Sequence, residues 1–391
     1  MDISAAPTIT AAVPGSFEWD VFHERHPKLI RQVLDSSPYT LAEEAKLQQL
    51  LDESTTGVLA PLPETAHDRQ EWLVWGEHLY GRPWGEVPFL WSESYFYRRL
   101  LGALGYFGTG TWRGIDPFAP AKNAELTGPE VDRELSAFAD LADASDDRRH
   151  EALLVAALWG NRADLSFQLQ LNTAGADAPS EGILVDDSAL LWSALTSRDN
   201  PVVCVVADNA GRELLADLVL ADSLLSRRLA AEIVLYVKPY PYYVSDATMA
   251  DVLSVIGRLR AEFRPQLSRI GDRLWAAVRS GRLQVRTHKF FCAPLAFHDM
   301  PDDLAAEFAT ATVTVMKGDL NYRRLVGDRY WPATTPFDHT VDYFPSAVTA
   351  LRTLKSEVVV GLTTEQLAGL DESGQPWRTS GRHALIQVHE P

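Results

Sequence analysis

The pattern of hydrophobic and polar residues changes near residue 200. Upstream, apolar residues recur at the three- and four-residue spacing of helices; downstream, short runs rich in Val, Ile and Leu alternate with helical segments. The clearest run is PVVCVV at residues 201–206, which suits a strand buried on both faces. The turn DNAG at residues 208–211 follows, and then leucines at helical spacing to residue 225. This stretch predicts a strand, a turn and a helix.

Further strands are predicted where short apolar runs recur between helical segments. They lie at residues 231–238, 283–291, 312–318, 356–362 and 383–389. Strands separated by helices are expected to pair mainly in parallel, through right-handed crossovers. The predicted fold class is therefore α/β with a mainly parallel sheet.

The N-terminal part of the chain is predicted to be mainly helical, from about residue 19 to residue 101. Residues 102–126 are rich in Gly and Pro and are expected to form a long ordered loop that leads into a further helix. We place a domain boundary after this loop, which divides the chain into residues 1–126 and 127–391. Two helices are predicted next, at residues 128–141 and 147–159.

A pair of arginines lies beside aromatic residues on one of the N-terminal helices. Arg98 and Arg99 are close in sequence to Trp91 and Tyr95. Such a pair can face solvent or an anionic ligand, and solvent is the commoner environment.

Net charge limits the partners that this chain can bind. Its 36 Lys and Arg against 53 Asp and Glu leave a formal charge of −17, so nucleic acid and anionic membranes are unlikely partners. An anionic substrate would need a metal ion or a local cluster of basic residues. Cys204 and Cys292 are too few for a disulfide framework or a zinc site and are expected in the core. Without a secretory signal or an uninterrupted membrane-length apolar run, a cytoplasmic location is expected.

Polar residues of complementary chemistry follow several of the predicted strands. Asp208 and Asn209 follow one strand, and Asp246 lies in the loop after the next. If these strand ends meet, two carboxylates and an amide oxygen form a site suited to Mg²⁺ or Mn²⁺, and Lys317 and Arg323 supply donors for a phosphate. The alternative for Asp208 is a helix cap, a role that Asp and Asn perform well.

Several familiar active-site motifs are missing. The turn DNAGREL lacks the G-x-G-x-x-G of a dinucleotide site, and neither a P-loop nor the G-x-S-x-G elbow of an α/β-hydrolase occurs. The D-x-D-x-[TV] pattern of haloacid-dehalogenase-like phosphatases is also missing. These absences exclude the commonest nucleotide-binding and hydrolase sites.

Four phrases together resemble a known family. VVADNAGRELLADLVLADSLL, VSDATMADV, MKGDLNYRRLVGD and RTLKSEVVVGL have the order and approximate spacing of the DUF89 damage-control phosphatases. The RTLK phrase at residues 352–355 resembles the RTxK signature of the sugar-phosphate phosphatase subfamily III, whose animal members are also called acidic residue methyltransferases. SYFYRRL and LWGNRADLS resemble the same subfamily.

The resemblance implies a three-layer α/β/α Rossmann-like domain with a helical N-terminal part. It further implies a metal-dependent phosphomonoesterase that uses Mn²⁺, Mg²⁺, Ni²⁺ or Co²⁺. Expected substrates are small sugar phosphates such as fructose 1-phosphate, fructose 6-phosphate or ribose 5-phosphate. Dephosphorylation of a sugar or nucleoside phosphate in a dedicated biosynthetic step would use the same residues.

The family's functional residues carry over to matching positions of this chain. The resemblance makes Asp208, Asn209 and Asp246 the metal ligands and catalytic residues. The substrate-binding residues are Asp319, Leu320, Asn321, Tyr322, Arg323 and Lys355, of which Lys355 binds the phosphate. The further candidates are Lys317, Arg352, Asn161, Asp164 and Glu213. Glu213 lies one turn after the first metal ligands and could orient a water.

Alternatives remain for the mechanism and for the function. Either a water activated by the metal or Asp208 itself attacks phosphorus, and we favour water because a coordinating carboxylate is a poor nucleophile. The competing functions are an S-adenosylmethionine-dependent carboxyl methyltransferase and an inactive metal-binding scaffold. The single glycine of the DNAG turn disfavours the methyltransferase, and the retention of every family ligand disfavours the scaffold.

Overall fold

The computed structural model describes residues 6–160 and 182–391. Within them a seven-stranded sheet has the order β1-β7-β6-β5-β2-β3-β4. Its strands are β1 (Ile183–Asp186), β2 (Val202–Val206), β3 (Glu232–Val237), β4 (Leu283–Thr287), β5 (Val313–Lys317), β6 (Ala347–Thr353) and β7 (Ala384–His389). From β2 the chain adds β3 and β4 on one side and then β5 on the other. The switch point of the sheet, where open α/β sheets bind ligands, therefore lies between β2 and β5.

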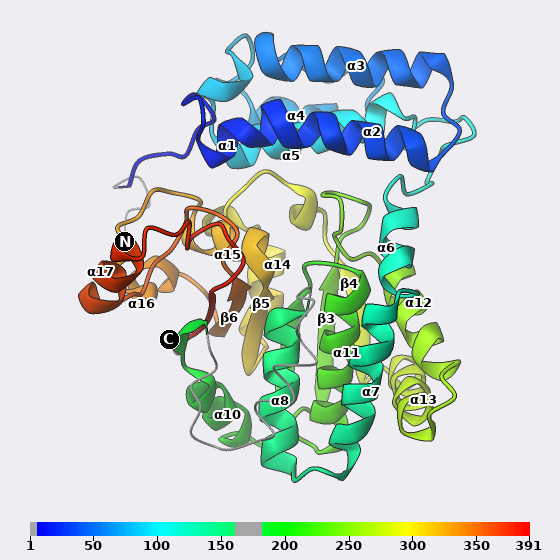
Figure 1. Ribbon diagram of the computed structural model, residues 1–391, viewed down its shortest axis with the longest axis vertical. Coiled ribbons are helices and arrows are strands. Elements are labelled where there is room, and N and C mark those ends of the chain that lie inside the picture. Colours follow the sequence, from blue (N-terminus) through cyan, green and yellow to red (C-terminus); the bar gives the residue numbers. More distant parts are fainter. Residues whose placement is uncertain (1–5, 161–181) are drawn as a thin grey trace.

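Helices cover both faces of this sheet (Figure 1). One face packs against α7 (Pro129–Asp140), α8 (Asp146–Trp159), α10 (Ser188–Thr196), α11 (Gly211–Ser226), α12 (Met249–Arg260) and α13 (Pro265–Ser280). The other packs against α14 (Asp302–Ala309), α15 (Gly318–Val326), α16 (Phe337–Val341) and α17 (Thr364–Glu372). Successive residues of β2 point to opposite faces of the sheet. Val203 belongs to the core under α7 to α13, and Cys204 belongs to the core under α14 to α17. The predicted α/β fold with a mainly parallel sheet is confirmed.

The N-terminal helices form a layer across one end of the sheet domain (Figure 1). They are α1 (Phe17–Asp20), α2 (His26–Ser36), α3 (Leu41–Thr56), α4 (Arg69–Trp75) and α5 (Phe89–Ala103), followed by α6 (Ala119–Glu125). A π-helical turn at Val21–Arg25 joins α1 and α2 into one helical run. A continuous hydrophobic core connects this layer with the sheet, since Phe96 and Val206 belong to the same cluster. The boundary at residue 126 stays a prediction.

The predicted strand at residues 356–362 is wrong, and β6 at Ala347–Thr353 takes its place in the sheet. Val358, Val359 and Val360 are buried as the apolar run suggests, but side chains bind backbone groups of Val358 and Val360. The Tyr322 hydroxyl contacts the Val360 N–H at 3.3 Å, and Gln387 Nε2 donates to the Val360 carbonyl at 2.9 Å. A buried apolar run can therefore lie outside a sheet when side chains, and not a neighbouring strand, bind its peptide groups.

Other differences from the predicted elements are smaller. Strand β7 runs antiparallel to β6, the one antiparallel pair among the described strands, and β1 was not predicted. The predicted strand at residues 283–291 ends at Thr287, and a 3₁₀ turn follows. The predicted loop at residues 102–126 contains α6 at its end.

Arg98 faces neither solvent nor an anionic ligand. It is 3% exposed, and its Nε donates to Asp68 Oδ2 at 2.6 Å while its Nη2 binds the other carboxylate oxygen. Trp72 Nε1 donates to the same carboxylate at 3.1 Å. Arg99 pairs with Glu53 at 2.7 Å. The paired arginines thus hold the helical layer together.

None of the helices in residues 6–160 and 182–391 combines the length and the apolar character that a membrane span requires. Cys204 and Cys292 are free and buried, as expected.

We expect Asp68→Ala to lower the free energy of unfolding by about 3–5 kcal/mol, because it leaves the Arg98 charge buried without its partner. Urea unfolding followed by circular dichroism measures this loss. The control is Asp132→Ala, which removes the partner of Arg258. Because the Asp132 side chain is 61% exposed, this change should lower the free energy of unfolding by less than about 1 kcal/mol. Equal losses in the two variants would contradict the assignment.

Candidate active site at the carboxyl edge of the sheet

The loops after β2 and β3 are hydrogen-bonded to each other directly beyond the sheet. The Ala247 N–H donates to the Asp208 carbonyl at 2.8 Å, the Ala210 N–H donates to the Ser245 carbonyl at 2.6 Å, and Asn209 forms a bridge with Asp246. These backbone contacts bring Asp208, Asn209 and Asp246 to one place, as the strand order requires.

Asp208 does not cap the following helix. The residue at the N-cap of α11 is Ala210, and this position makes no side-chain cap hydrogen bond. Instead, Asn209 Nδ2 donates to Asp208 Oδ2 at 3.0 Å and to Glu213 Oε2 at 2.9 Å. Gly318 after β5 has φ +78°, and a Cβ there would overlap the Asp208 carboxylate. A glycine is therefore required for β5 to approach this carboxylate.

The carboxylates at this edge are buried close enough to one another to interact. Burial, together with the nearby charges of Glu213 and Asp246, raises the pKa of Asp208 well above its ordinary value. Burial also raises the pKa of Asp246, although Lys238, with its Nζ 3.9 Å from Asp246 Oδ2, opposes the shift. A divalent cation would relieve this repulsion.

The donor set suits a hard divalent cation. Among the residues that the structure describes, no group of three or more His, Cys, Asp and Glu is arranged to hold a metal ion. The set here is two carboxylates and the amide oxygen of Asn209, which accepts a hydrogen bond from the Ser245 hydroxyl. Such oxygen donors fit a Mg²⁺-like or Mn²⁺-like ion that keeps several waters.

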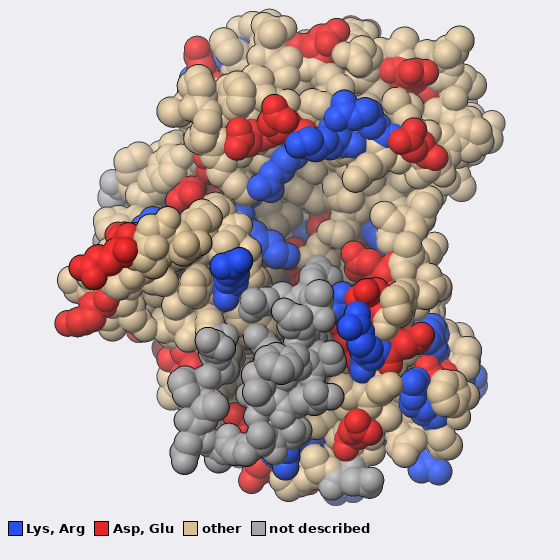
Figure 2. All heavy atoms as spheres, in the orientation of Figure 1, with Lys and Arg blue, Asp and Glu red and all other residues tan. Residues whose placement is uncertain are grey.

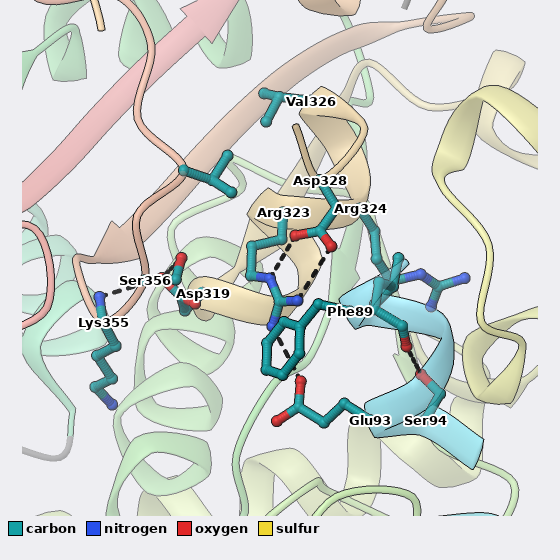
Figure 3. A network of polar contacts seen from close by, with 12 residues as sticks. Phe89, Glu93, Ser94, Asp319, Arg323, Arg324, Val326, Asp328, Lys355 and Ser356 are labelled. Atoms are coloured by element: carbon teal, nitrogen blue, oxygen red, sulfur yellow. Dashed lines mark hydrogen bonds and ion pairs between the residues drawn. The ribbon is translucent and has the colours of Figure 1, made fainter. Parts of the chain in front are cut away.

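Asp319, at the start of α15, is held by the segment that carries the RTLK phrase (Figure 3). Its Oδ1 accepts from Arg352 Nε at 2.9 Å, from the Lys355 backbone N–H at 3.2 Å and from Ser356 Oγ at 3.1 Å. Burial opposes ionisation of this carboxyl, but the Arg352 and Arg323 charges outweigh it and lower its pKa. The Lys355 side chain extends away from Asp319 (Figure 3).

Two cavities meet at these residues, below the helical layer, where Figure 2 shows a hollow. The smaller has a volume of about 320 Å³ and includes Glu213 and Trp159 in its wall. The larger, of about 470 Å³, extends to α1 and α2. Asp208, Asp319 and Lys355 line both cavities. A substrate can therefore contact the carboxylates and the lysine at once.

Comparison with known proteins assigns the chain to a family. The family model described as the damage-control phosphatase ARMT1-like domain matches residues 21–370. The chain belongs to the damage-control phosphatase ARMT1-like family. The damage-control phosphatase ARMT1 of Danio rerio is 30% identical, covering 98% of this chain and 97% of its own length, and that of Homo sapiens is 29% identical, covering 96% and 97%. The resemblance inferred from the four sequence phrases is confirmed.

A solved structure shares the fold of this ARMT1-like chain. A DUF89 family protein of Pyrococcus horikoshii superposes with a TM-score of 0.51 at 15% sequence identity, covering 94% of this chain and 97% of its own. At this level of identity the likeness shows a common fold alone.

Not every residue carried over from the ARMT1-like family faces a cavity. Besides the residues already placed, Leu320 and Arg323 line the larger cavity. Asn321 and Tyr322 are fully buried. Asn321 Nδ2 donates to the carbonyls of Ala207 at 3.1 Å and Lys317 at 2.9 Å, so it fastens the end of β2 to the end of β5.

Lys317 and Arg352 are also turned inward. Lys317 Nζ lies 2.9 Å from Asp217 and 3.6 Å from Glu213, so its charge is already paired. Arg352 is 0% exposed and binds Asp319. The prediction that Lys317 supplies a donor for a phosphate therefore lacks support from its position. Asn161 and Asp164 lie outside the described residues.

Sequence reasoning missed polar residues that complete the larger cavity. Glu93 on α5 lies 3.2 Å from Arg323 Nη1 (Figure 3). The Tyr243 hydroxyl is 3.3 Å from the same carboxylate. Lys122 on α6, which follows the GIDPF phrase that also resembles the family, does not line this cavity. It donates to the Asp246 carbonyl at 2.7 Å and pairs with Asp116 and Asp251. A lone acidic residue in the aromatic helix FLWSESYFYRRLLGA was the signal available for Glu93.

We expect Asp208→Asn to stabilise the metal-free protein at pH 8. Because the pKa of Asp208 is raised in the folded chain, the folded state binds its proton more tightly than the unfolded state, and stability falls as pH rises through that pKa. Removing the charge should recover on the order of 1 kcal/mol or more, since one pKa unit corresponds to about 1.4 kcal/mol.

Urea unfolding in EDTA measures this gain, which should shrink as the pH is lowered toward 4. Asp52→Asn, at an exposed position on α3, serves as the control and should change stability little at either pH. A loss of stability in Asp208→Asn at pH 8 would show that the carboxylate is stabilising.

Proposed function

We propose that this chain is a metal-dependent phosphomonoesterase that hydrolyses small sugar phosphates, such as fructose 1-phosphate, fructose 6-phosphate or ribose 5-phosphate, in metabolite damage control or in a dedicated dephosphorylation. The observation that carries the proposal is the meeting of buried, mutually repelling carboxylates with an exposed lysine on one cavity. The acids can hold a cation, and both the cation and Lys355 attract phosphate. The family's name supports the reaction class.

Asp208, Asn209 and Asp246 would hold the cation, which can be Mn²⁺, Mg²⁺, Ni²⁺ or Co²⁺. When bound, it supplies Lewis-acid chemistry that polarises a phosphoryl oxygen and lowers the pKa of water. The reaction adds water across the P–O ester bond, so that an alcohol and inorganic phosphate leave.

Lys355 is the cation of this chain best placed for the phosphate. Its side chain is exposed, lines both cavities and has no ion pair among the described residues. Its backbone N–H is bonded to Asp319, so the lysine is anchored at its base and its ammonium is left to bind oxygen. Arg352 acts through Asp319 as a positioning residue.

Glu213 is positioned to orient the attacking water. Its carboxylate accepts from Asn209 Nδ2, lies 3.6 Å from Lys317 and forms part of the wall of the smaller cavity. Asp208 is 6% exposed and accepts from Asn209, which favours water over Asp208 as the nucleophile. Trapping of a phosphoenzyme would reverse this preference.

The methyltransferase alternative finds no support in the turn after β2. The side chain of Glu125 packs against Gly211, the glycine that would face a nucleotide-like cofactor. The Glu125 carboxylate therefore occupies the space next to this turn in which a cofactor would have to bind.

We expect phosphate release from a panel of sugar and nucleoside phosphates that depends on Mn²⁺, Mg²⁺, Ni²⁺ or Co²⁺ and falls at least about a hundredfold in Asp208→Ala. A colorimetric phosphate assay measures it, and Asp52→Ala controls for the loss of one acidic residue. If folded intact protein releases no phosphate with any metal, the scaffold and methyltransferase alternatives gain over the phosphatase.

We expect Lys355→Ala to lower kcat/KM by about 10–100-fold, the value of a charge-assisted hydrogen bond to phosphate. Steady-state kinetics on the best substrate of the panel tests this. Lys289→Ala is the matched control, because Lys289 is 75% exposed and lines neither cavity. An unchanged kcat/KM in Lys355→Ala would remove Lys355 from the phosphate site.

A further inference from the structure

The larger cavity has a basic wall opposite the acidic one. Arg25, Lys28 and Gln32 line it from the helical run formed by α1, the π-helical turn and α2. Their spacing places them on one side of a helix. Figure 2 shows a row of Lys and Arg side chains along the helical layer, above the hollow.

The charges of Arg25 and Lys28 are available to a ligand. The Arg25 guanidinium lies over the Phe17 ring at 4.4 Å and has no carboxylate partner among the described residues. A cation–π contact does not use up the N–H donors of the guanidinium, which can still bind an anion. Within residues 6–160 and 182–391, Lys28 pairs only with Glu24, at 3.5 Å. Both side chains are at least 60% exposed, so this pair is weak.

A chain of aromatic rings connects the basic wall with the metal-ligand loop. His26, next to Arg25, contacts Tyr97 with ring centroids 5.7 Å apart, and Tyr97 contacts Tyr243 at 4.6 Å. The Tyr243 backbone N–H donates to Asp246 Oδ2 at 3.1 Å. These contacts connect the two walls through packed side chains, and both walls line the same cavity.

Charge and size together define what fits this space. The carboxylate end needs a cation and a phosphate, whereas the opposite end offers the positive charges of Arg25 and Lys28. A cavity of about 470 Å³ lies within the usual range for small-molecule sites. A ligand with one phosphate would leave Arg25 and Lys28 unused.

We propose that Arg25 and Lys28 form a subsite for a second anionic group, a phosphate or a carboxylate, so that the preferred substrate is a phosphorylated sugar with an anion at each end. The inference rests on the proposed phosphatase activity and specifies its substrate class. The arginine fork can bind either group through two N–H donors, and the lysine adds a point charge.

The test compares fructose 1-phosphate with fructose 1,6-bisphosphate and 6-phosphogluconate, which carry a second phosphate or a carboxylate. Intact protein should show a higher kcat/KM for at least one of the two doubly anionic compounds. Arg25→Ala and Lys28→Ala should each lower that value about threefold to tenfold, while fructose 1-phosphate changes less than about twofold. The response of the two compounds identifies the second group as phosphate or carboxylate.

Arg31→Ala is the matched control. It removes the same charge from an exposed position on α2 that lines neither cavity, so it should leave all three substrates unchanged. Any effect of net charge alone would appear equally in this variant.

A binding measurement separates this proposal from the phosphatase itself. Calorimetry in EDTA should show fructose 1,6-bisphosphate or 6-phosphogluconate binding to the full chain more tightly than fructose 1-phosphate, with the difference lost in the Arg25→Ala, Lys28→Ala double variant and kept in Arg31→Ala. Equal affinity for all three compounds, or equal losses for all of them in the double variant, overturns the subsite while leaving the phosphatase intact. If no compound releases phosphate, the proposed function fails, and the calorimetry still decides whether the subsite exists.

Discussion

The site depends on negative charge gathered at one buried edge of the sheet and held there by buried cations. Asp208, Glu213, Asp217 and Asp246 lie at this edge, and each is at most 7% exposed. Lys317 pairs with Asp217 and Glu213 in the interior, and even so burial raises the pKa of Asp217 to about 7. Burial of so many carboxylates together is unfavourable while they are charged, and the cation of the proposed function would offset this cost.

The strand order explains why the cluster forms where it does. Strands β2 and β5 are neighbours although more than a hundred residues separate them, and the loops beyond them approach closely because Gly318 has no side chain. Asn321 spans the same gap with hydrogen bonds to both strand ends. The geometry of the site therefore depends on residues that hold the strand ends together as well as on those that face the cavity.

The RTLK phrase holds Asp319 in place through Arg352 and also supplies Lys355 to the cavities. Arg352 is buried over the Tyr322 ring at 4.1 Å, and it binds Asp319 together with the carbonyl of Val358. This network fixes the backbone at Lys355 through its N–H bond to Asp319, while the Lys355 side chain extends along the cavities. The helical layer completes the site from the opposite side and brings positive charge to a molecule that is acidic as a whole.

The sequence by itself determined the strand–turn–helix at residues 201–225, the mainly parallel sheet and the family, because hydrophobic periodicity and short motifs are local properties of the chain. It did not decide which residues of DLNYR face the cavity, nor that Arg98 pairs with Asp68 or that residues 356–362 stay outside the sheet. Those outcomes depend on partners far away in the chain: Asp68 for Arg98, and Tyr322 and Gln387 for Val360. Only the tertiary structure could decide them, because burial and ion pairing are set by what packs from distant elements, which no local pattern encodes.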